Sequence, residues 1–412
     1  MPGWFSRSWL LPVVAGLGLA ACGKGAGGVG NDAAADTASA QEDAAPQADV
    51  ARDTALQVDA TDDGPRPDGA PADGPPQSDG GVNGCLKGTF DPYWGNLHAH
   101  TSFSDGTGSP AQAYDYARYT AGLDIQVLTD HVEQIPLKGG WGPYVAAGDA
   151  ADAPGTFVAM AGFEYGSGFT LGIPPKSTGH NNVFFSPDVF PAVQVDFHDF
   201  YATLIACTTC IGQFNHPGDG STTSWTNYEY HADADQRLNL FEFNSPVAWD
   251  QFFLALDKGW TVSPMWNQDN HGDDWGTKND DRSGLWMSSL DRVAMYDAML
   301  KRRTFATSDK KAWIKMLALG DCWMGSIIKG VSSVPITVEV NDTDNDHGFT
   351  TIELFGPNKA SLGTHDCAGA MTCTASFAVT ITSPPGSTYV VARATMTSSA
   401  YLVSAPVWAS LQ

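Results

Sequence analysis

Residues 94–106 read "WGNLHAHTSFSDG" and join a short apolar run to two histidines and an aspartate. The apolar run predicts a strand around Tyr93 to Leu97, and the polar residues follow its carboxyl end. Side chains two positions apart on an extended chain point to the same side, so His98 and His100 would present their imidazoles together. Imidazole and carboxylate groups are ligands for zinc, manganese and iron. Taken alone, the stretch is equally compatible with an ordinary polar loop, so its meaning depends on the rest of the chain.

Six further apolar runs follow, separated by helix-like or loop segments. They predict strands at Ile125–Leu128, Phe157–Ala161, Asn182–Phe185, Ile211–Phe214, Leu238–Phe243 and Val262–Trp266. Alternation of strands with helices is typical of a β/α architecture, and seven such strands suggest a barrel.

Two helices are expected at particular places. Ser109 and Gln112 have the spacing of a capping box, which predicts a helix over about Ala111 to Ala121. The segment from Ser288 to Arg302 carries apolar residues at helical spacing. It is expected to cover the barrel.

Nearly every predicted strand is followed by side chains that can bind metal. His98 and His100 follow the first strand, Asp130 and His131 the second, Glu164 the third, His216 the fifth, and Asp269 and His271 the seventh, whereas His180 precedes the fourth. The carboxyl ends of parallel barrel strands converge on one face, so these residues are expected to share one pocket. The sequence has no Gly-x-Ser-x-Gly motif that would favour a serine nucleophile.

This ordered set of motifs resembles the PHP family, the polymerase and histidinol phosphatase metallohydrolases. The matching motifs run from Trp94 to His271 and read "LHAHTSFSDG", "GLDIQVLTDH", "AGFEYG", "GHNNVFF", "FNHP" and "NQDNHG". The resemblance implies an α/β fold, a distorted (β/α)7 TIM-like barrel, and a centre of two or three divalent metal ions (Zn, Mn or Fe).

The resemblance also implies how the ligands are shared among the ions. One ion would be held by His98, His100 and Asp269, a second by His180 and His216 with Glu164 bridging the two, and a third by Asp105, His131 and His271. Many family members carry a histidine near the position of Asp105.

Several other polar residues are expected to act outside the three ligand groups. Asp130 is expected to orient an imidazole ligand. Arg282 follows the last motif and would either hold an anionic oxygen of the substrate or form a surface salt bridge. Glu242, on the sixth strand, is expected to be a buried structural carboxylate rather than a partner of a ligand. Histidines off the strand ends are expected to be structural or exposed, namely His198, His231, His347 and His365.

The amino-acid composition and the hydrophobic pattern of the sequence change after Lys311. Stretches such as "VPITVEVNDT" and "TYVVARATM" alternate and are rich in Val, Thr and Ser, which predicts a small antiparallel β domain over residues 311–412, after a barrel over 85–310. The motifs "RSGLW" and "LKRRTFATSD" resemble secreted carbaryl-hydrolase-like members of the PHP family. That looser resemblance covers Arg282 to about Gly325.

The first part of the chain predicts export. Residues 1–22 have Arg7 ahead of a short apolar run, and Leu19 to Cys22 resemble a bacterial lipobox in which Cys22 becomes lipidated; the alternative is an ordinary cleaved signal. Residues 23–84 are rich in Ala, Gly, Asp and Pro and are expected to form a disordered tether. The protein would then be anchored by lipid to a bacterial membrane, in the periplasm or at the cell surface.

Six further cysteines suggest disulfides in an oxidising compartment. The two short spacings favour Cys207 with Cys210 and Cys367 with Cys373, which leaves Cys85 with Cys322. A zinc site built from these cysteines is the alternative.

The sequence favours a metal-dependent hydrolase, most specifically a phosphoesterase in which metal-activated water attacks the substrate. An amide, carbamate or ester hydrolase would use the same centre, and a non-catalytic surface binding protein with structural metal is a third hypothesis. The chain has 46 Asp and Glu against 22 Lys and Arg, which argues against nucleic acid as a partner and leaves a small molecule as the expected substrate. The sequence does not predict an oligomeric state.

Overall fold

The computed structural model describes residues 84–166, 179–191, 197–218, 225–382 and 385–412. The predicted signal peptide, the lipobox cysteine Cys22 and the tether up to residue 83 lie outside the described residues. Among the helices that are described, none is long and apolar enough to span a membrane.

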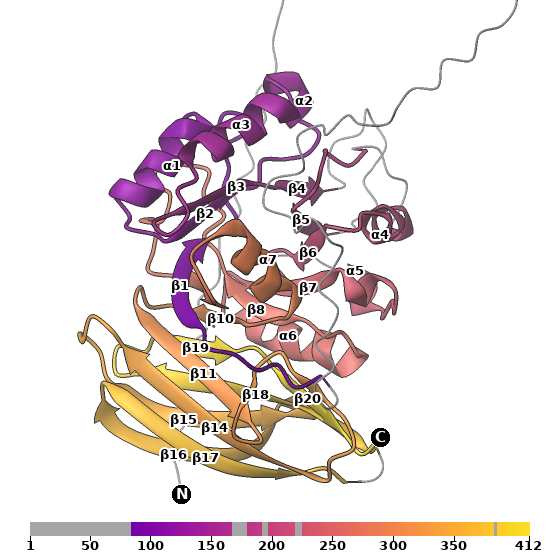
Figure 1. Cartoon of the computed structure of the whole chain (residues 1–412), viewed down its shortest axis with the longest axis vertical. Helices are drawn as coiled ribbons and strands as arrows, with labels where there is room; N and C mark the ends of the chain where they lie inside the picture. The colour runs from indigo at the N-terminus through magenta and orange to yellow at the C-terminus, as the bar shows by residue number, and fades with distance from the viewer. Residues whose placement is uncertain (1–83, 167–178, 192–196, 219–224, 383–384) are drawn as a thin grey trace, which may run out of the picture. The chain divides into compact units, whose positions relative to one another are not determined.

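Helices are few and mostly short in the described part of the chain. They are α1 (Pro110–Tyr119), α2 (Ile135–Lys138), α3 (Trp141–Ala151), α4 (Phe197–Ala206), α5 (Trp225–Tyr228), α6 (Val247–Lys258) and α7 (Arg292–Leu300). α1 and α3 pack together against β2 and β3, and α6 lies along β7 (Figure 1).

The strands before residue 310 belong to two sheets. One sheet has the order β4 (Phe163–Gly166), β5 (His180–Phe184), β6 (Ile211–Phe214), β7 (Leu238–Phe243) and β8 (Ser263–Trp266). Strand β5 runs antiparallel to both of its neighbours, whereas β6, β7 and β8 are parallel. The other sheet contains the parallel strands β1 (Asp91–Asn96), β2 (Ile125–Leu128) and β3 (Val158–Ala161), followed on the far side of β1 by β9 (Arg282–Met287) and β10 (Thr304–Thr307).

The predicted closed barrel is not seen in the described part of the chain. The two sheets approach each other at isolated bridges, His131 with Glu164 and Ala99 with Asn270, and no continuous ladder joins them. Side chains replace main-chain pairing at one junction, where the N–H of Leu97 donates to Oδ1 of Asn267 at 2.9 Å. The fold is therefore mixed α/β with many strands, few helices and several sheets.

Both predicted helices are present, with shifted boundaries. The capping box is confirmed, because the Ser109 hydroxyl accepts the N–H of Gln112 and the Gln112 side chain accepts the N–H of Ser109. The later helix begins at Arg292 rather than at Ser288, because Asp291 caps it by accepting the N–H of Ala294 at 2.8 Å.

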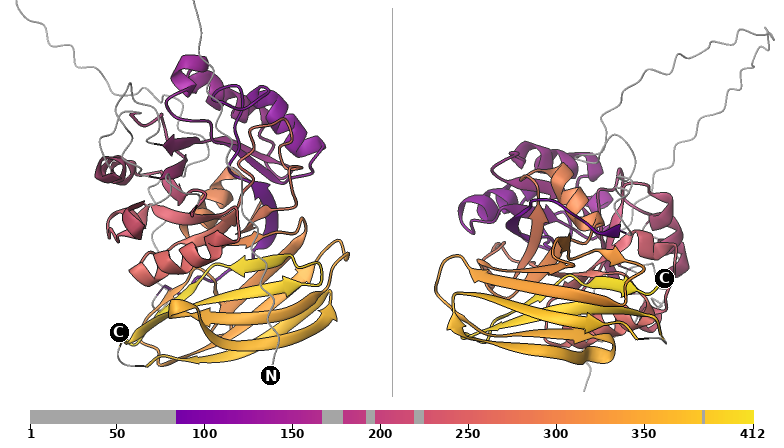
Figure 2. Two further views of the ribbon diagram at one scale, coloured as in Figure 1. Left: turned by 180° about the vertical axis from the view of Figure 1, so that it is seen from behind. Right: turned by 60° about the horizontal axis from the view of Figure 1, so that its bottom comes forward.

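The last hundred residues form two further layers of strands. A four-stranded sheet has the order β12 (Cys322–Trp323), β11 (Ala312–Ala318), β14 (Ser333–Asp342) and β17 (Thr372–Thr380). The strands β13 (Ile327–Ile328), β15 (Phe349–Gly356), β16 (Ala360–Ala370), β18 (Ser387–Met396), β19 (Tyr401–Ser404) and β20 (Val407–Ser410) extend the larger sheet. The two layers enclose an apolar core, and their stacking is visible in Figure 2.

Main-chain pairing crosses the predicted domain boundary at residues 310 and 311. Strand β10 pairs with β9 on one side and with β19 on the other, so a single ladder links the metal-ligand half of the chain to the C-terminal strands. Phe305 and Trp286, from the first half, belong to the same apolar core as Leu402, from the second. The C-terminal β region is thus built onto the site-bearing sheet.

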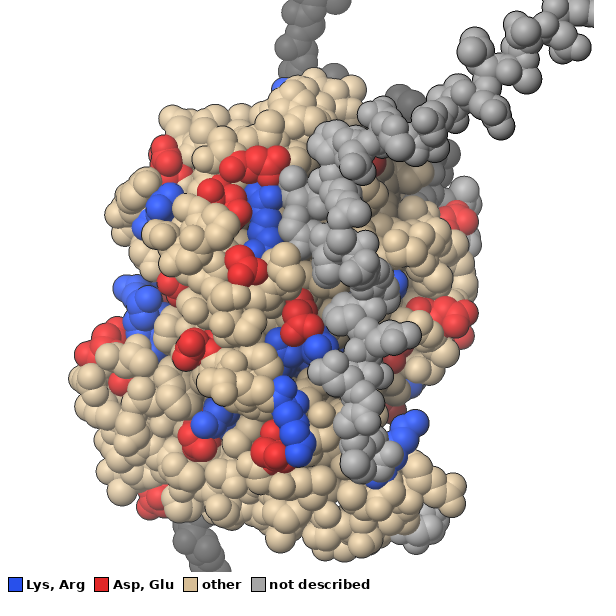
Figure 3. Space-filling model, viewed as in Figure 1, with Lys and Arg blue, Asp and Glu red and all other residues tan. Residues whose placement is uncertain are grey.

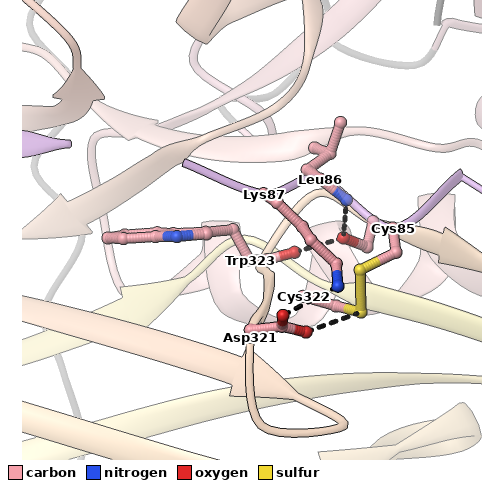
Figure 4. The surroundings of a disulfide bond; sticks show 7 residues. Cys85, Leu86, Lys87, Asp321, Cys322 and Trp323 are labelled. Carbon is pink, nitrogen blue, oxygen red and sulfur yellow. Dashed lines mark hydrogen bonds and ion pairs between the residues drawn. A yellow bond between two sulfur atoms is a disulfide. The ribbon is translucent and has the colours of Figure 1, made fainter. Parts of the chain in front are cut away.

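The three predicted disulfides are confirmed: Cys85–Cys322, Cys207–Cys210 and Cys367–Cys373. The first of them joins residues 237 positions apart and ties the segment before β1 to β12 (Figure 4). Next to it, the N–H of Trp323 donates to the carbonyl of Leu86, and Lys87 forms an ion pair with Asp321 at 2.7 Å.

Candidate metal centre

The residues predicted as ligands come from the ends of strands in both sheets. His98 and His100 follow β1, His131 follows β2, Glu164 lies on β4, His180 begins β5, His216 follows β6, and Asp269 and His271 follow β8. His180 is the first residue of its strand rather than one that follows it, yet it reaches the same place because β5 is antiparallel to β4 and β6. The beginning of an antiparallel strand lies beside the carboxyl ends of its neighbours.

A first group of ligand atoms comprises Nε2 of His98, Nε2 of His100 and Oδ1 of Asp269. The two nitrogens lie 3.3 Å apart, and they lie 3.3 and 3.2 Å from the Asp269 oxygen. Ligand atoms in a tetrahedral zinc site with bonds of about 2.0 Å are separated by about 3.3 Å. Oδ1 of Asp269 is buried and makes no hydrogen bond. An orphaned buried oxygen facing two imidazole nitrogens fits a bound cation.

A second group is centred on Oε1 of Glu164. This oxygen lies 3.1 Å from Nδ1 of His180 and 3.1 Å from Nε2 of His216, and the two nitrogens are themselves 3.1 Å apart. The same oxygen lies 3.3 Å from Nε2 of His98, in the first group. Glu164 therefore occupies the position between the two groups that a bridging ligand requires.

A third group is more exposed to solvent. Asp105 places Oδ1 3.3 Å from Nε2 of His271 and Oδ2 3.6 Å from Nε2 of His131. The side chains of Asp105 and His271 are 48% and 42% exposed, whereas those of His98 and His100 have no exposed area. Nδ1 of His131 lies 3.2 Å from Oε2 of Glu164, so this group adjoins the other two.

The charges of the cluster shift its pKa values in opposite directions. Burial opposes ionisation of Glu164, but the imidazoles of His180, His98 and His131 hold the pKa of that carboxyl well below its usual range. Burial alone would lower the pKa of His98, yet Glu242, Asp269 and Glu164 raise it well above the ordinary value. Without metal, a proton on the His98 imidazole would balance part of the charge of the buried carboxylates, and metal binding would displace it.

Glu242 is a site residue whose role the sequence interpretation underestimated. Its side chain has no exposed area, and its Oε1 lies 2.9 Å from Nδ1 of His98. Its Oε2 accepts the N–H of His216 at 2.6 Å. Because a carboxylate only accepts, Nδ1 of His98 carries the hydrogen and Nε2 presents its lone pair to the centre. The signal in the sequence was a charged residue inside the otherwise apolar stretch "LFEF".

Asp130 contacts a ligand through an intermediate residue. Its carboxylate accepts the N–H and hydroxyl of Thr101 and the hydroxyl of Ser104, at 2.8, 2.7 and 2.6 Å. The Ser104 hydroxyl in turn lies 3.1 Å from Nδ1 of His100. Asp130 is therefore placed to orient the His100 ring by way of Ser104.

Arg282 has partners other than those expected from the sequence. Its guanidinium is buried and donates to the carbonyls of Gly276, Asn279 and Asp281, at 2.8, 3.1 and 2.7 Å. These carbonyls belong to the loop that follows His271. The structure thus gives Arg282 neither a surface salt bridge nor a position among the ligands, because the main-chain carbonyls of this loop take up its donors.

The main chain is strained at two of the candidate ligands. His216 and Asp269 have φ angles of +28° and +46°, in the region that side chains other than glycine rarely adopt. Such strain collects at functional sites, where the surrounding structure holds it in place.

The histidines off the strand ends have other surroundings. His231 accepts the N–H of Ala234 at 3.2 Å, His347 contacts Asp346, and His365 is exposed. The ring of His198 lies 6.5 Å from that of His231.

The chain has structural likenesses among solved proteins. No protein-family model and no curated protein matches the chain. It is similar in structure to a two-domain protein from Bacteroides vulgatus that contains a predicted PHP-like metal-dependent phosphoesterase, with 18% identity, a TM-score of 0.43, and coverage of 76% of this chain and 94% of that one. It is also similar to a lesion-specific endonuclease from Pyrococcus furiosus, with 12% identity, a TM-score of 0.35, and coverage of 51% and 56%. Likenesses this low carry no argument, so the interpretation of the site rests on its own geometry.

Proposed function

We propose that this protein is a metal-dependent hydrolase, and specifically a phosphoesterase, with two or three divalent ions (Zn, Mn or Fe) in the centre around Glu164. One observation carries the proposal: Oε1 of Glu164 lies 3.1–3.3 Å from nitrogens of His98, His180 and His216, which belong to two different ligand groups. A carboxylate shared in this way suits two ions held close together.

Two such ions, when bound, lower the pKa of a shared water and polarise a phosphoryl oxygen of the substrate. The protein's own contribution begins with exclusion of solvent, since His98, His100 and Glu164 are buried. Asp105 and His271 form the more exposed part of the centre, so we expect the substrate to approach from their side.

Positioning residues hold the ligand rings in their working orientation. Glu242 keeps the proton on Nδ1 of His98, which leaves Nε2 directed into the centre. Asp130 holds Ser104, and Ser104 contacts the other ring nitrogen of His100. Buried partners of this kind reduce the cost of ordering the ligands when metal binds.

The alternatives differ in what the centre does. An amide, carbamate or ester hydrolase would use the same ligands on a different substrate. A surface binding protein with structural metal is less well supported, because a structural site usually needs four ligands and many more converge here. The finer assignment, to the carbaryl-hydrolase-like branch of the PHP family, is part of the proposal and rests on the sequence motifs alone.

We also propose that the protein is exported and anchored by lipid at Cys22, ahead of a tether (23–84), a metal-binding region (85–310) and a β region (311–412). Three disulfides support an oxidising compartment. The proposed substrate is a small molecule rather than nucleic acid. On the face shown in Figure 3, Lys and Arg side chains lie among acidic ones and do not form a basic patch.

The experiment combines metal analysis with a substrate screen on the full chain. We expect at least two equivalents of Zn, Mn or Fe per chain, and hydrolysis of p-nitrophenyl phosphate or bis(p-nitrophenyl) phosphate that is lost on chelation and restored by metal. His180→Ala should reduce both metal content and hydrolysis, whereas His365→Ala, at an exposed position, should change neither. Hydrolysis of aryl esters or carbamates alone would favour the first alternative, and stoichiometric metal without any hydrolysis would favour the binding protein. A protein that takes up no metal would refute the proposal.

A further inference from the structure

The loop between β14 and β15 carries alternating aspartates in the C-terminal β region. Residues 341–348 read "NDTDNDHG", so Asp342, Asp344 and Asp346 are each separated by one residue. The loop between β10 and β11 brings a fourth carboxylate, Asp309, within 4.0 Å of Nδ1 of His347. None of these residues belongs to the centre around Glu164.

Asp342 is a buried carboxylate that is only half satisfied. The residue has no exposed area, and its Oδ2 accepts the N–H groups of Asp346 and His347, at 3.0 and 2.9 Å. Its Oδ1 is buried as well and has no hydrogen-bond partner. A buried carboxylate oxygen without a hydrogen-bond donor is open to a cation.

The carboxylate of Asp342 also acts on the ionisation of a second aspartate. Its interaction with Asp344, together with some burial, raises the pKa of Asp344 to about 6. Two carboxylates held this close repel each other unless a proton or a cation lies between them. A cation between Asp342 and Asp344 would relieve this repulsion.

Nearby cations do not supply that charge. Lys310 pairs with Asp280 at 2.9 Å, and Nζ of Lys311 lies 5.0 Å from the centre of the Trp94 ring. Within the described residues, no ion pair joins a Lys or Arg to Asp342, Asp344 or Asp346. A single imidazole, that of His347, faces this group of carboxylates.

The Asp309 carboxylate is held in place by its own loop. Its Oδ1 accepts the N–H groups of Lys311 and Ala312, both at 2.9 Å, and its side chain is only 11% exposed. The two loops are also joined directly, because the Thr343 hydroxyl donates to the carbonyl of Lys311 at 2.8 Å. A ligand bound here would contact both loops.

We propose that Asp342, Asp344 and Asp346, with Asp309, bind a calcium ion that fastens the β14–β15 loop to the β10–β11 loop. Calcium takes six to eight oxygen ligands from carboxylates, carbonyls and water in flexible geometry. The donor set is rich in carboxylate oxygens and poor in imidazole, which favours calcium over zinc or iron. This site is independent of the proposed hydrolase and would stabilise the strand β10 that links the two halves of the chain.

Calcium titration of the zinc-loaded full chain tests the proposal. Raising CaCl2 to about 10 mM, well above the Kd of about 1 mM of weak extracellular calcium sites, should raise the Tm of the wild type. The same concentration of MgCl2 should have a smaller effect. Asp342→Asn and Asp344→Asn should each weaken calcium binding by at least about tenfold. Loss of a residue that only hydrogen-bonds to a metal ligand already has an effect of this size. Calorimetry measures the affinity. Asp366→Asn, at an exposed aspartate of β16, should bind calcium as the wild type does.

Two results would overturn the proposal. In the first, calcium changes neither the Tm of the wild type nor the heat of titration, and Asp342→Asn is at least as stable as the wild type. A proton shared by the two aspartates would then explain the pair. The other is calcium binding that persists in both loop variants but disappears in His98→Ala/His100→Ala, which would assign the ion to the centre around Glu164.

Discussion

Oε1 of Glu242 lies 2.9 Å from Nδ1 of His98, and neither side chain has any exposed area. This contact decides which nitrogen of His98 faces Glu164 and Asp269. The first prediction is that Glu242→Gln lowers metal affinity by about 10–100-fold, because the amide can no longer hold the ring as an ionised acceptor does. Competition with a chromophoric chelator measures the affinity, and Glu353→Gln, on β15, serves as the control. Wild-type affinity in Glu242→Gln would show that Glu242 is only a core residue.

The second prediction concerns the number of ions. Asp105→Ala should remove about one equivalent of metal and leave the other two groups loaded. Asp105 contacts His131 and His271, and it meets His100 only at Nδ1, 3.6 Å away, rather than at the Nε2 that belongs to the first group. Elemental analysis after dialysis gives the stoichiometry. Loss of all metal would mean that the groups do not fill independently, and unchanged content would mean that Asp105 is not a ligand.

The third prediction separates two roles for Arg282. If its guanidinium holds the 276–281 loop through three carbonyls, Arg282→Lys should lower the free energy of unfolding by about 1–3 kcal/mol, because a lysine cannot satisfy all three at once. Hydrolysis of anionic and neutral substrates should then change by similar factors. A loss of kcat/KM confined to anionic substrates, with stability unchanged, would instead support direct contact with the substrate.

The fourth prediction compares two disulfides. Replacing Cys85 and Cys322 by alanine should cost about 2–5 kcal/mol in the free energy of unfolding, whereas replacing Cys207 and Cys210 should cost less. The reason is the length of the closed loop, since the paired cysteines are 237 positions apart in the first case and 3 in the second. Urea unfolding of the two double variants measures the difference, and equal costs would contradict the chain-entropy explanation.

The fifth prediction is a pH dependence at Asp281. Burial raises the pKa of Asp281 to about 6, although the charge of Arg282 opposes the shift. The protonated form is thus favoured by folding, so its contribution to stability is complete below pH 4 and is lost as the pH rises through about 6. The free energy of unfolding of Asp281→Asn minus that of the wild type should therefore be about 1–3 kcal/mol larger at pH 7.5 than at pH 4. Parallel pH dependences of stability in the two proteins would show that Asp281 is not perturbed.

Local signals in the sequence predicted the local structure well. The capping box at Ser109 and Gln112 depends on residues three positions apart, and it forms as expected. The strand that ends before His98 and the short cysteine pairs are similar cases. Closure of the barrel was wrong as a prediction, because it depends on whether strands distant in sequence share hydrogen bonds, and at one junction the side chain of Asn267 makes the bond instead.

The sequence by itself determined which side chains can hold metal and that they stand at the ends of strands, because ligand chemistry and the two-residue period of a strand are properties of the residues themselves. Only the tertiary structure decided that the reversed strand β5 brings His180 to Glu164, that Glu242 rather than Arg282 touches a ligand, and that β10 joins both halves in one sheet. Those relationships arise from non-local packing and from the reversed direction of β5, which no spacing in the chain specifies.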